Sequence, residues 1–164
     1  NLGNSPDILG HTLWIDADQV IEVDGELIPT GAMLPVEGTP YDLRTPQPLG
    51  EVMRREDNAM FAAAKGFDIG YVLNGGGMRQ IARLHDPDSG RVMTVSTDQP
   101  GVQCYSGQGF NCGGRAGHHY CAYAGIALET QQHPDTLHQP SFGTTLLQPG
   151  QAYQTSTIYA FTAQ

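Results

Sequence analysis

Short stretches of this chain alternate between apolar and polar residues, the two-residue period of β-strands that bury one face. In the first stretch Leu13 and Ile15 fall on one face, and in the last Thr157, Tyr159 and Phe161 do so. The alternation predicts strands at residues 11–16, 19–23, 71–73, 81–86, 91–97, 102–106, 125–131 and 153–162.

Turn and helix signals lie between these strands. The sequence Pro-Asp-Ser-Gly at 87–90 predicts a hairpin turn, because Pro presets φ and Gly tolerates a positive φ. The stretch DNAMFAAAK at 57–65 predicts one short helix, capped by Asp57 or Asn58 and ended by Gly66.

The composition suits short strands joined by many turns, since only 15% of the 164 residues are charged and the chain contains 21 Gly and 11 Pro. Residues 107–117 are rich in Gly and lack periodicity, which predicts a mobile loop. No repeat or linker divides the chain. We therefore expect residues 1–164 to form a single domain with an all-β fold, an antiparallel β-sandwich.

The charge and hydropathy of the chain argue against two classes of partner, nucleic acids and membranes. The net charge of −9 argues against nucleic acid, which requires a basic face. No apolar run approaches the ~20 residues of a membrane-spanning helix, so we expect no membrane partner. No signal peptide is visible, and the localisation stays open between cytoplasm and periplasm.

The three cysteines, Cys104, Cys112 and Cys121, allow either three thiols or one disulfide with one thiol. Reduced thiols are favoured because the chain shows no small-domain disulfide framework. His118 and His119 lie near these cysteines, but the spacing is not that of a structural zinc site, and we expect no metal.

Short motifs follow one another along almost the whole chain. They are DIL at 7–9, LIPTG at 27–31, GTP at 38–40 with Asp42 and Arg44, GFD at 66–68 with YVLN at 71–74, DP at 86–87 with SGR at 89–91, PGVQ at 100–103, and LETQ at 128–131 with PD at 134–135 and PSF at 140–142. In number and order they resemble the C-terminal half of the aldose 1-epimerase (galactose mutarotase) family. The resemblance implies a mutarotase-like β-sandwich and interconversion of the α and β anomers of a hexose such as galactose or glucose. No cofactor is implied, because both chemical steps are proton transfers.

The resemblance also implies the roles of three residues. Glu129 would be the catalytic base, and Asp68 and Gln103 would bind sugar hydroxyls. Without the resemblance they would be interpreted as a solvated strand-end Glu, a turn residue and a cross-strand polar pair. The chain departs from the family pattern at Ile69, where His is usual, and at Cys104, where Phe is common, which puts the surroundings of the site in doubt.

We expect Glu129 to be partly buried, because Ile126 and Leu128 are apolar, and partial burial raises the pKa of a carboxyl group. The family's acid is a His in an H-x-Y-F-N-L segment, and this chain begins at Asn1-Leu2, after that His. We therefore expect a base without its acid. The partner would be the N-terminal half of the same protein or a second copy of this chain.

Other interpretations stay open. His133 is better explained as a loop residue than as the missing acid, and Trp14 as a core residue than as a sugar platform. The chain as a whole could instead be a non-catalytic carbohydrate-binding module on the same fold, or an inactive structural fragment.

Overall fold

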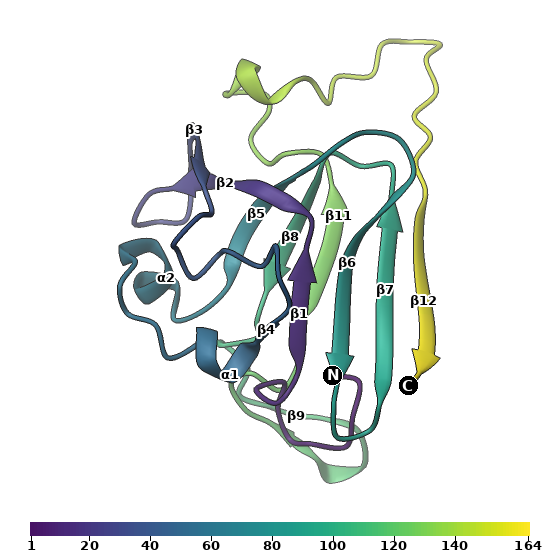
Figure 1. Ribbon diagram of the computed structural model, residues 1–164. Coiled ribbons are helices and arrows are strands. Elements are labelled where there is room, and N and C mark those ends of the chain that lie inside the picture. The colour runs from purple at the N-terminus through teal and green to yellow at the C-terminus, as the bar shows by residue number, and fades with distance from the viewer.

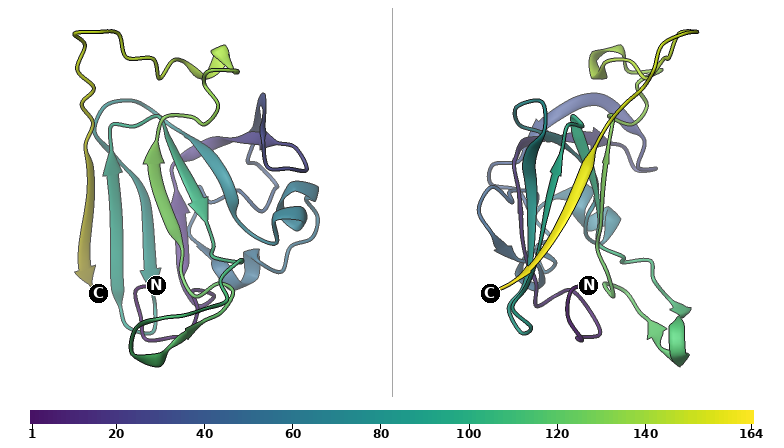
Figure 2. Two further views of the ribbon diagram at one scale, coloured as in Figure 1. Left: turned by 180° about the vertical axis from the view of Figure 1, so that it is seen from behind. Right: turned by 90° about the vertical axis from the view of Figure 1, so that its right-hand side faces the viewer.

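Two five-stranded antiparallel sheets lie face to face in the computed structural model (Figure 1; Figure 2, right). Apolar side chains from both sheets form one buried core. The model describes the backbone of residues 1–164 and every side chain but that of Ala116. We call the sheets A and B. The predicted all-β antiparallel sandwich is confirmed.

The strand orders in the two sheets are β12-β7-β6-β1-β4 and β11-β8-β5-β2-β3. Sheet A consists of β1 (Thr12–Ile15), β4 (Gln47–Pro48), β6 (Arg79–Asp86), β7 (Arg91–Thr97) and β12 (Thr157–Ala163). Sheet B consists of β2 (Ala17–Val23), β3 (Pro29–Pro35), β5 (Asp68–Leu73), β8 (Gly101–Tyr105) and β11 (Ala127–Gln131). A two-stranded ribbon pairs β9 (Cys112–Gly113) with β10 (His119–Tyr120). The helices are α1 (Leu49–Val52), α2 (Ala59–Ala64) and two 3₁₀ turns, Arg115–Gly117 and Pro140–Phe142.

Side chains from both sheets and from α2 fill the core. Tyr71 on β5 is fully buried, and its hydroxyl donates a hydrogen bond to the Tyr41 carbonyl at 3.1 Å. Phe61 of α2 packs edge-on against Tyr41 and against Phe67, with ring centroids 5.5 and 5.1 Å apart. This aromatic cluster fixes the chain just ahead of Asp68, the first residue of β5.

The predicted helix exists but is shorter than 57–65. Asn58 is the N-cap, since its Oδ1 accepts a hydrogen bond from the Phe61 N–H at 3.0 Å. The helix ends at Lys65, which takes a left-handed φ of 59° ahead of Gly66. The predicted hairpin turn is also present, with Gly90 at φ 69° and its N–H donating to the Asp86 carbonyl.

Several expectations were wrong. Trp14 was expected in the core, but it is half-buried on the face opposite Leu13 and Ile15. Its indole N–H donates to the Arg44 carbonyl at 3.0 Å. The stretch 107–117 is not wholly irregular, because it contains β9. The last strand begins at Thr157 rather than at 153, since the Ser156 N–H bonds the Asp98 carboxylate instead of a neighbouring strand.

None of the described helices is long and apolar enough to cross a membrane.

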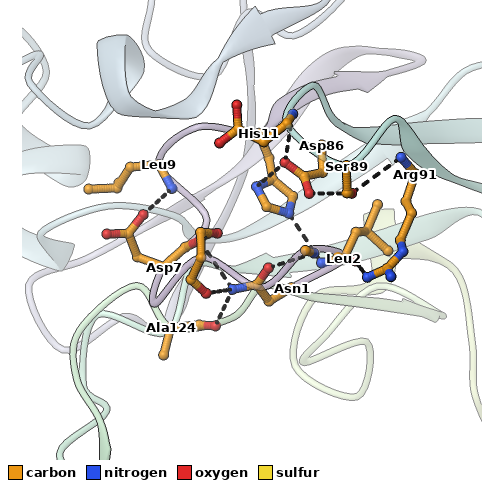
Figure 3. A network of polar contacts seen from close by, with 12 residues as sticks. Asn1, Leu2, Asp7, Leu9, His11, Asp86, Ser89, Arg91 and Ala124 are labelled. Carbon is orange, nitrogen blue, oxygen red and sulfur yellow. Dashed lines mark hydrogen bonds and ion pairs between the residues drawn. The ribbon is translucent and has the colours of Figure 1, made fainter. Parts of the chain in front are cut away.

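A polar network holds the first residues of the chain against the β6–β7 hairpin (Figure 3). The fully buried His11 accepts a hydrogen bond at Nε2 from the Leu2 N–H at 3.1 Å. Arg91 donates to the Leu2 carbonyl at 2.8 Å. A Cβ at Gly3 would collide with the Asp86 carboxylate, so a larger residue there would displace that side chain.

We expect this network to make stability depend on pH. Burial lowers the pKa of His11 from its usual 6.5, although Asp86 opposes that effect. The unfolded chain therefore binds this proton more readily, and folding stability falls as pH drops through about 6.5 and below. Urea unfolding between pH 5 and 8 measures the slope. His11→Gln keeps an acceptor for Leu2 and cannot titrate, so it should reduce the slope, and the remainder should come from His133, whose pKa burial also lowers. The same slope in both proteins would contradict this account.

Candidate active site

The three residues implied by the resemblance share the outer face of sheet B. Gln103 lies on β8 between β5 and β11, and it pairs with Gly70 on one side and with Glu129 on the other. Side chains of directly opposed residues lie on the same face. Asp68 lies two residues before Gly70, and its Oδ1 accepts a hydrogen bond from Gln103 Nε2 at 2.8 Å. The fold thus brings Asp68, Gln103 and Glu129 together on adjacent strands, which lie side by side in Figure 1.

The departures from the family pattern lie on the opposite face of the sheet. Ile69 and Cys104 are paired across β5 and β8, and both are buried in the core between the sheets, as is Leu128 on β11. Burial also raises the pKa of the Cys104 thiol. The two substitutions therefore change the packing of the core rather than the polar surface that holds Asp68 and Gln103.

A hollow of about 180 Å³ adjoins this polar group. Gly70 helps to keep it open, because a Cβ there would lie 3.3 Å from Ile21 Cδ1 and 3.4 Å from Gln103 Oε1. One side of the hollow is apolar and the other carries a carboxylate and amides, which accept and donate hydrogen bonds as sugar hydroxyls require. Its lining residues are Ile21, Val23, Leu27, Pro29, Asp68, Gly70, Gln103, Gln131 and Pro134.

Glu129 is exposed, so the expectation of partial burial was wrong. The physical reason is the position of β11, which is the edge strand of sheet B and pairs only with β8. None of the described side chains donates a hydrogen bond to the Glu129 carboxylate. Its position therefore depends on the backbone of β11.

His133 is buried, and its ring packs edge-on against Phe142 at a centroid distance of 5.8 Å. A Cβ at Gly101 would lie 2.9 Å from His133 Nδ1, and no described group bonds that nitrogen. Burial lowers the pKa of His133 and favours the neutral ring. A neutral, packed imidazole fits the interpretation as a loop residue better than the role of the missing acid.

The other candidate ligands are dispersed. All three cysteines are free, with Cys112 exposed on β9, Cys121 exposed just after β10 and Cys104 in the core. His119 Nε2 lies 2.8 Å from the Asn111 Oδ1. Among the described residues no group of three His, Cys, Asp or Glu side chains is placed to hold a metal ion.

A second hollow, of about 930 Å³, is lined mainly by residues of the long segment between β11 and β12. Figure 1 shows that segment at the top. Its lining is mixed, with Gln132 and Thr136 beside Leu137, Leu146 and Leu147. The alternation of the sequence gave no sign of it, because this segment has no regular period.

The match to known proteins is consistent along the chain. The model of the family described as aldose 1-epimerase matches residues 1–160. The chain belongs to the aldose 1-epimerase family. Membership confirms the resemblance carried by the motifs.

Members of the family similar to this chain include the galactose mutarotases of Rattus norvegicus and Homo sapiens, each 41% identical over 160 residues, which are 96% of this chain and 45% of the relative. The aldose 1-epimerase of Escherichia coli K12 is 30% identical over 169 residues, covering 99% of this chain and 48% of the relative.

Solved structures agree with the fold. A GalM/aldose epimerase homologue from C. elegans superposes with a TM-score of 0.89 at 28% identity, over 99% of this chain and 49% of that one. A galactose 1-epimerase from Lactobacillus acidophilus gives a TM-score of 0.82 at 25% identity, over 96% of this chain and 45% of that one. The chain thus spans about half the length of the relatives it matches.

Proposed function

We propose that this chain provides the sugar-binding face and the catalytic base of an aldose 1-epimerase that interconverts the anomers of a hexose such as galactose or glucose. The observation that carries the proposal is the placement of Glu129 directly opposite Gln103, with Gln103 hydrogen-bonded to Asp68. Proteins similar to this chain bear the names galactose mutarotase and aldose 1-epimerase, which supports the same activity.

The arrangement suits acid–base ring opening. The Glu129 carboxylate removes the proton of the anomeric hydroxyl while an acid protonates the ring oxygen. The ring opens, the aldehyde end rotates, and closure gives the other anomer. Each proton-transfer group contributes typically about 10²- to 10⁴-fold to the rate. Asp68 and Gln103 lie on interior strands of sheet B and would orient the hydroxyls during these steps.

The acid would come from outside residues 1–164. The relatives are about twice as long as this chain, and the resemblance implies that the acid is a His in the part of the family pattern that this chain does not match. We propose that the rest of the protein, or a second copy of this chain, covers the outer face of sheet B, where Glu129 is exposed to solvent. His11 and Arg91 hold the first residues of this chain in place through hydrogen bonds to Leu2. A segment joined to these residues would therefore start from a fixed position.

One observation favours a non-catalytic carbohydrate-binding module as the second candidate. The residues that line the hollow beside Asp68 include no histidine. Such a module would bind sugar without changing the rate of mutarotation. Measuring sugar binding and turnover on one sample separates the two functions.

We expect Asp68→Ala and Gln103→Ala each to raise KM about tenfold or more and to change kcat less. A hydrogen bond to a charged group is worth about 1.5–3 kcal/mol, and these bonds form in both the ground state and the transition state. Steady-state polarimetry provides both constants. Gln80→Ala, an exposed amide on sheet A, is the matched control. An effect of Asp68→Ala on kcat alone would place Asp68 in the acid–base machinery instead.

A further inference from the structure

Both neighbours of Glu129 along β11 are bonded to one strand of the opposite sheet. The Tyr159 hydroxyl on β12 donates to the Leu128 carbonyl at 3.0 Å. The Thr157 hydroxyl, also on β12, lies 2.6 Å from the Thr130 hydroxyl. In the right-hand view of Figure 2 β12 runs obliquely across the edge where the two sheets meet. The two bonds therefore join the edge strands of sheets A and B.

On the side of sheet A, the strand that makes these two bonds is held in place by its neighbour β7. β12 pairs with β7 along its whole length, with Thr157 opposite Thr97. The hydroxyl groups of these two threonines are 3.0 Å apart, and the Thr97 hydroxyl also donates to the Ser156 carbonyl at 3.1 Å. A displacement of Thr157 would therefore require a displacement of β7 as well.

β11 is also an edge strand, which pairs with β8 along its whole length and has no strand on its other side. The free edge of such a strand frays more readily than an interior strand. The Leu128 carbonyl accepts its bond from Tyr159, which lies outside sheet B. Glu129 has no hydrogen bond to a described side chain, so the two bonds to its neighbours add to the pairing with β8 in fixing its position.

We infer that Thr157 and Tyr159 are positioning residues for the Glu129 carboxylate. The inference rests on the proposed role of Glu129 as base. A catalytic group has to be held within about 0.5 Å of its productive position. Tyr159 bonds the Leu128 carbonyl and Thr157 bonds the Thr130 side chain, one on each side of Glu129, while Asp68 and Gln103 lie on strands that are paired on both sides. Loss of the bonds should therefore lower kcat and leave KM nearly unchanged.

The first test uses Tyr159→Phe and Thr157→Val, singly and together, in the protein with its complete site. Both changes keep the shape of the side chain. Tyr159→Phe removes one hydrogen bond, and Thr157→Val removes the contacts of its hydroxyl with Thr130 and with Thr97. We expect each to lower kcat about threefold and the pair about tenfold or more, with KM within about twofold. Thr162→Val on the same strand and Tyr120→Phe on β10 repeat the chemistry at exposed positions and should leave kcat unchanged. Equal losses in the controls would overturn the inference.

A double-mutant cycle separates positioning from a general loss of structure. If Thr157 and Tyr159 act through Glu129, adding Tyr159→Phe and Thr157→Val to Glu129→Gln should lower kcat no further. A further tenfold loss in the Glu129→Gln background would overturn the inference and leave the proposed function standing.

Hydrogen exchange on residues 1–164 tests the contact without any activity. We expect amides at 128–130 to exchange about tenfold or more faster in the double variant, while those of β5, which does not pair with β11, stay unchanged. Unchanged exchange at 128–130 would overturn the inference by itself. If Glu129→Gln keeps normal turnover, the base assignment fails, and the exchange result still decides whether the bonds hold β11.

Discussion

Replacing Glu129 by Gln should lower the rate of mutarotation at least about 100-fold in the protein with its complete site. Gln keeps the shape of the side chain and cannot take up the proton of the anomeric hydroxyl, so the contribution of a general base is lost. The residue is exposed on an edge strand, which allows the substitution without a core defect. Polarimetry on freshly dissolved α-galactose or α-glucose measures the rate.

Glu56→Gln is the matched control, because Glu56 is an exposed carboxylate in the loop before α2. It should leave both kcat and the melting temperature unchanged. Near-normal turnover in Glu129→Gln, with the fold intact, would reject the assignment of the base.

Residues 1–164 alone should show at least about 100-fold less activity than the protein with its complete site, and should associate with a partner. β12 is an edge strand that pairs on one side only. It leaves Tyr159 and Phe161 on one face and Ile158 on the other, each between 45% and 66% exposed. Exposed apolar side chains on an unpaired edge are liabilities that proteins cover. The occupant would be the remaining part of the protein or a second copy.

Light scattering and polarimetry on the same sample decide the matter. Addition of the remaining part should restore turnover and raise the mass of the complex. A stable monomer of 17.6 kDa with full activity would contradict both the need for a partner and the absence of the acid.

Local patterns predicted much of the fold. The alternation of apolar residues located β6 and β7 with their turn, and Asn58 and Gly66 marked the ends of α2. β3 was missed because its sequence, PTGAMLP, has Pro at both ends, a Gly inside and no alternation. It forms a strand because β2 offers it backbone partners, which is a non-local cause.

The site was predictable only in part. The alternation indicates that the side chains of Glu129 and Leu128 point to opposite faces of a sheet. It does not show that β5, β8 and β11 are neighbours. That order arises from pairings between residues far apart in the chain, such as Gly70 with Gln103. The motifs supplied the three candidate site residues, which stay a prediction. No local pattern indicated that Tyr159 would bond the strand carrying Glu129, since the contact joins two sheets.

The measurement that tests the central claim most directly is a crystal structure of the Glu129→Gln variant, with its complete site, soaked with galactose. The account predicts the sugar on the outer face of sheet B, with hydroxyls bonded to Asp68 and Gln103 and the anomeric carbon next to position 129. Sugar bound instead in the hollow under the segment between β11 and β12, with the outer face of sheet B empty, would contradict it.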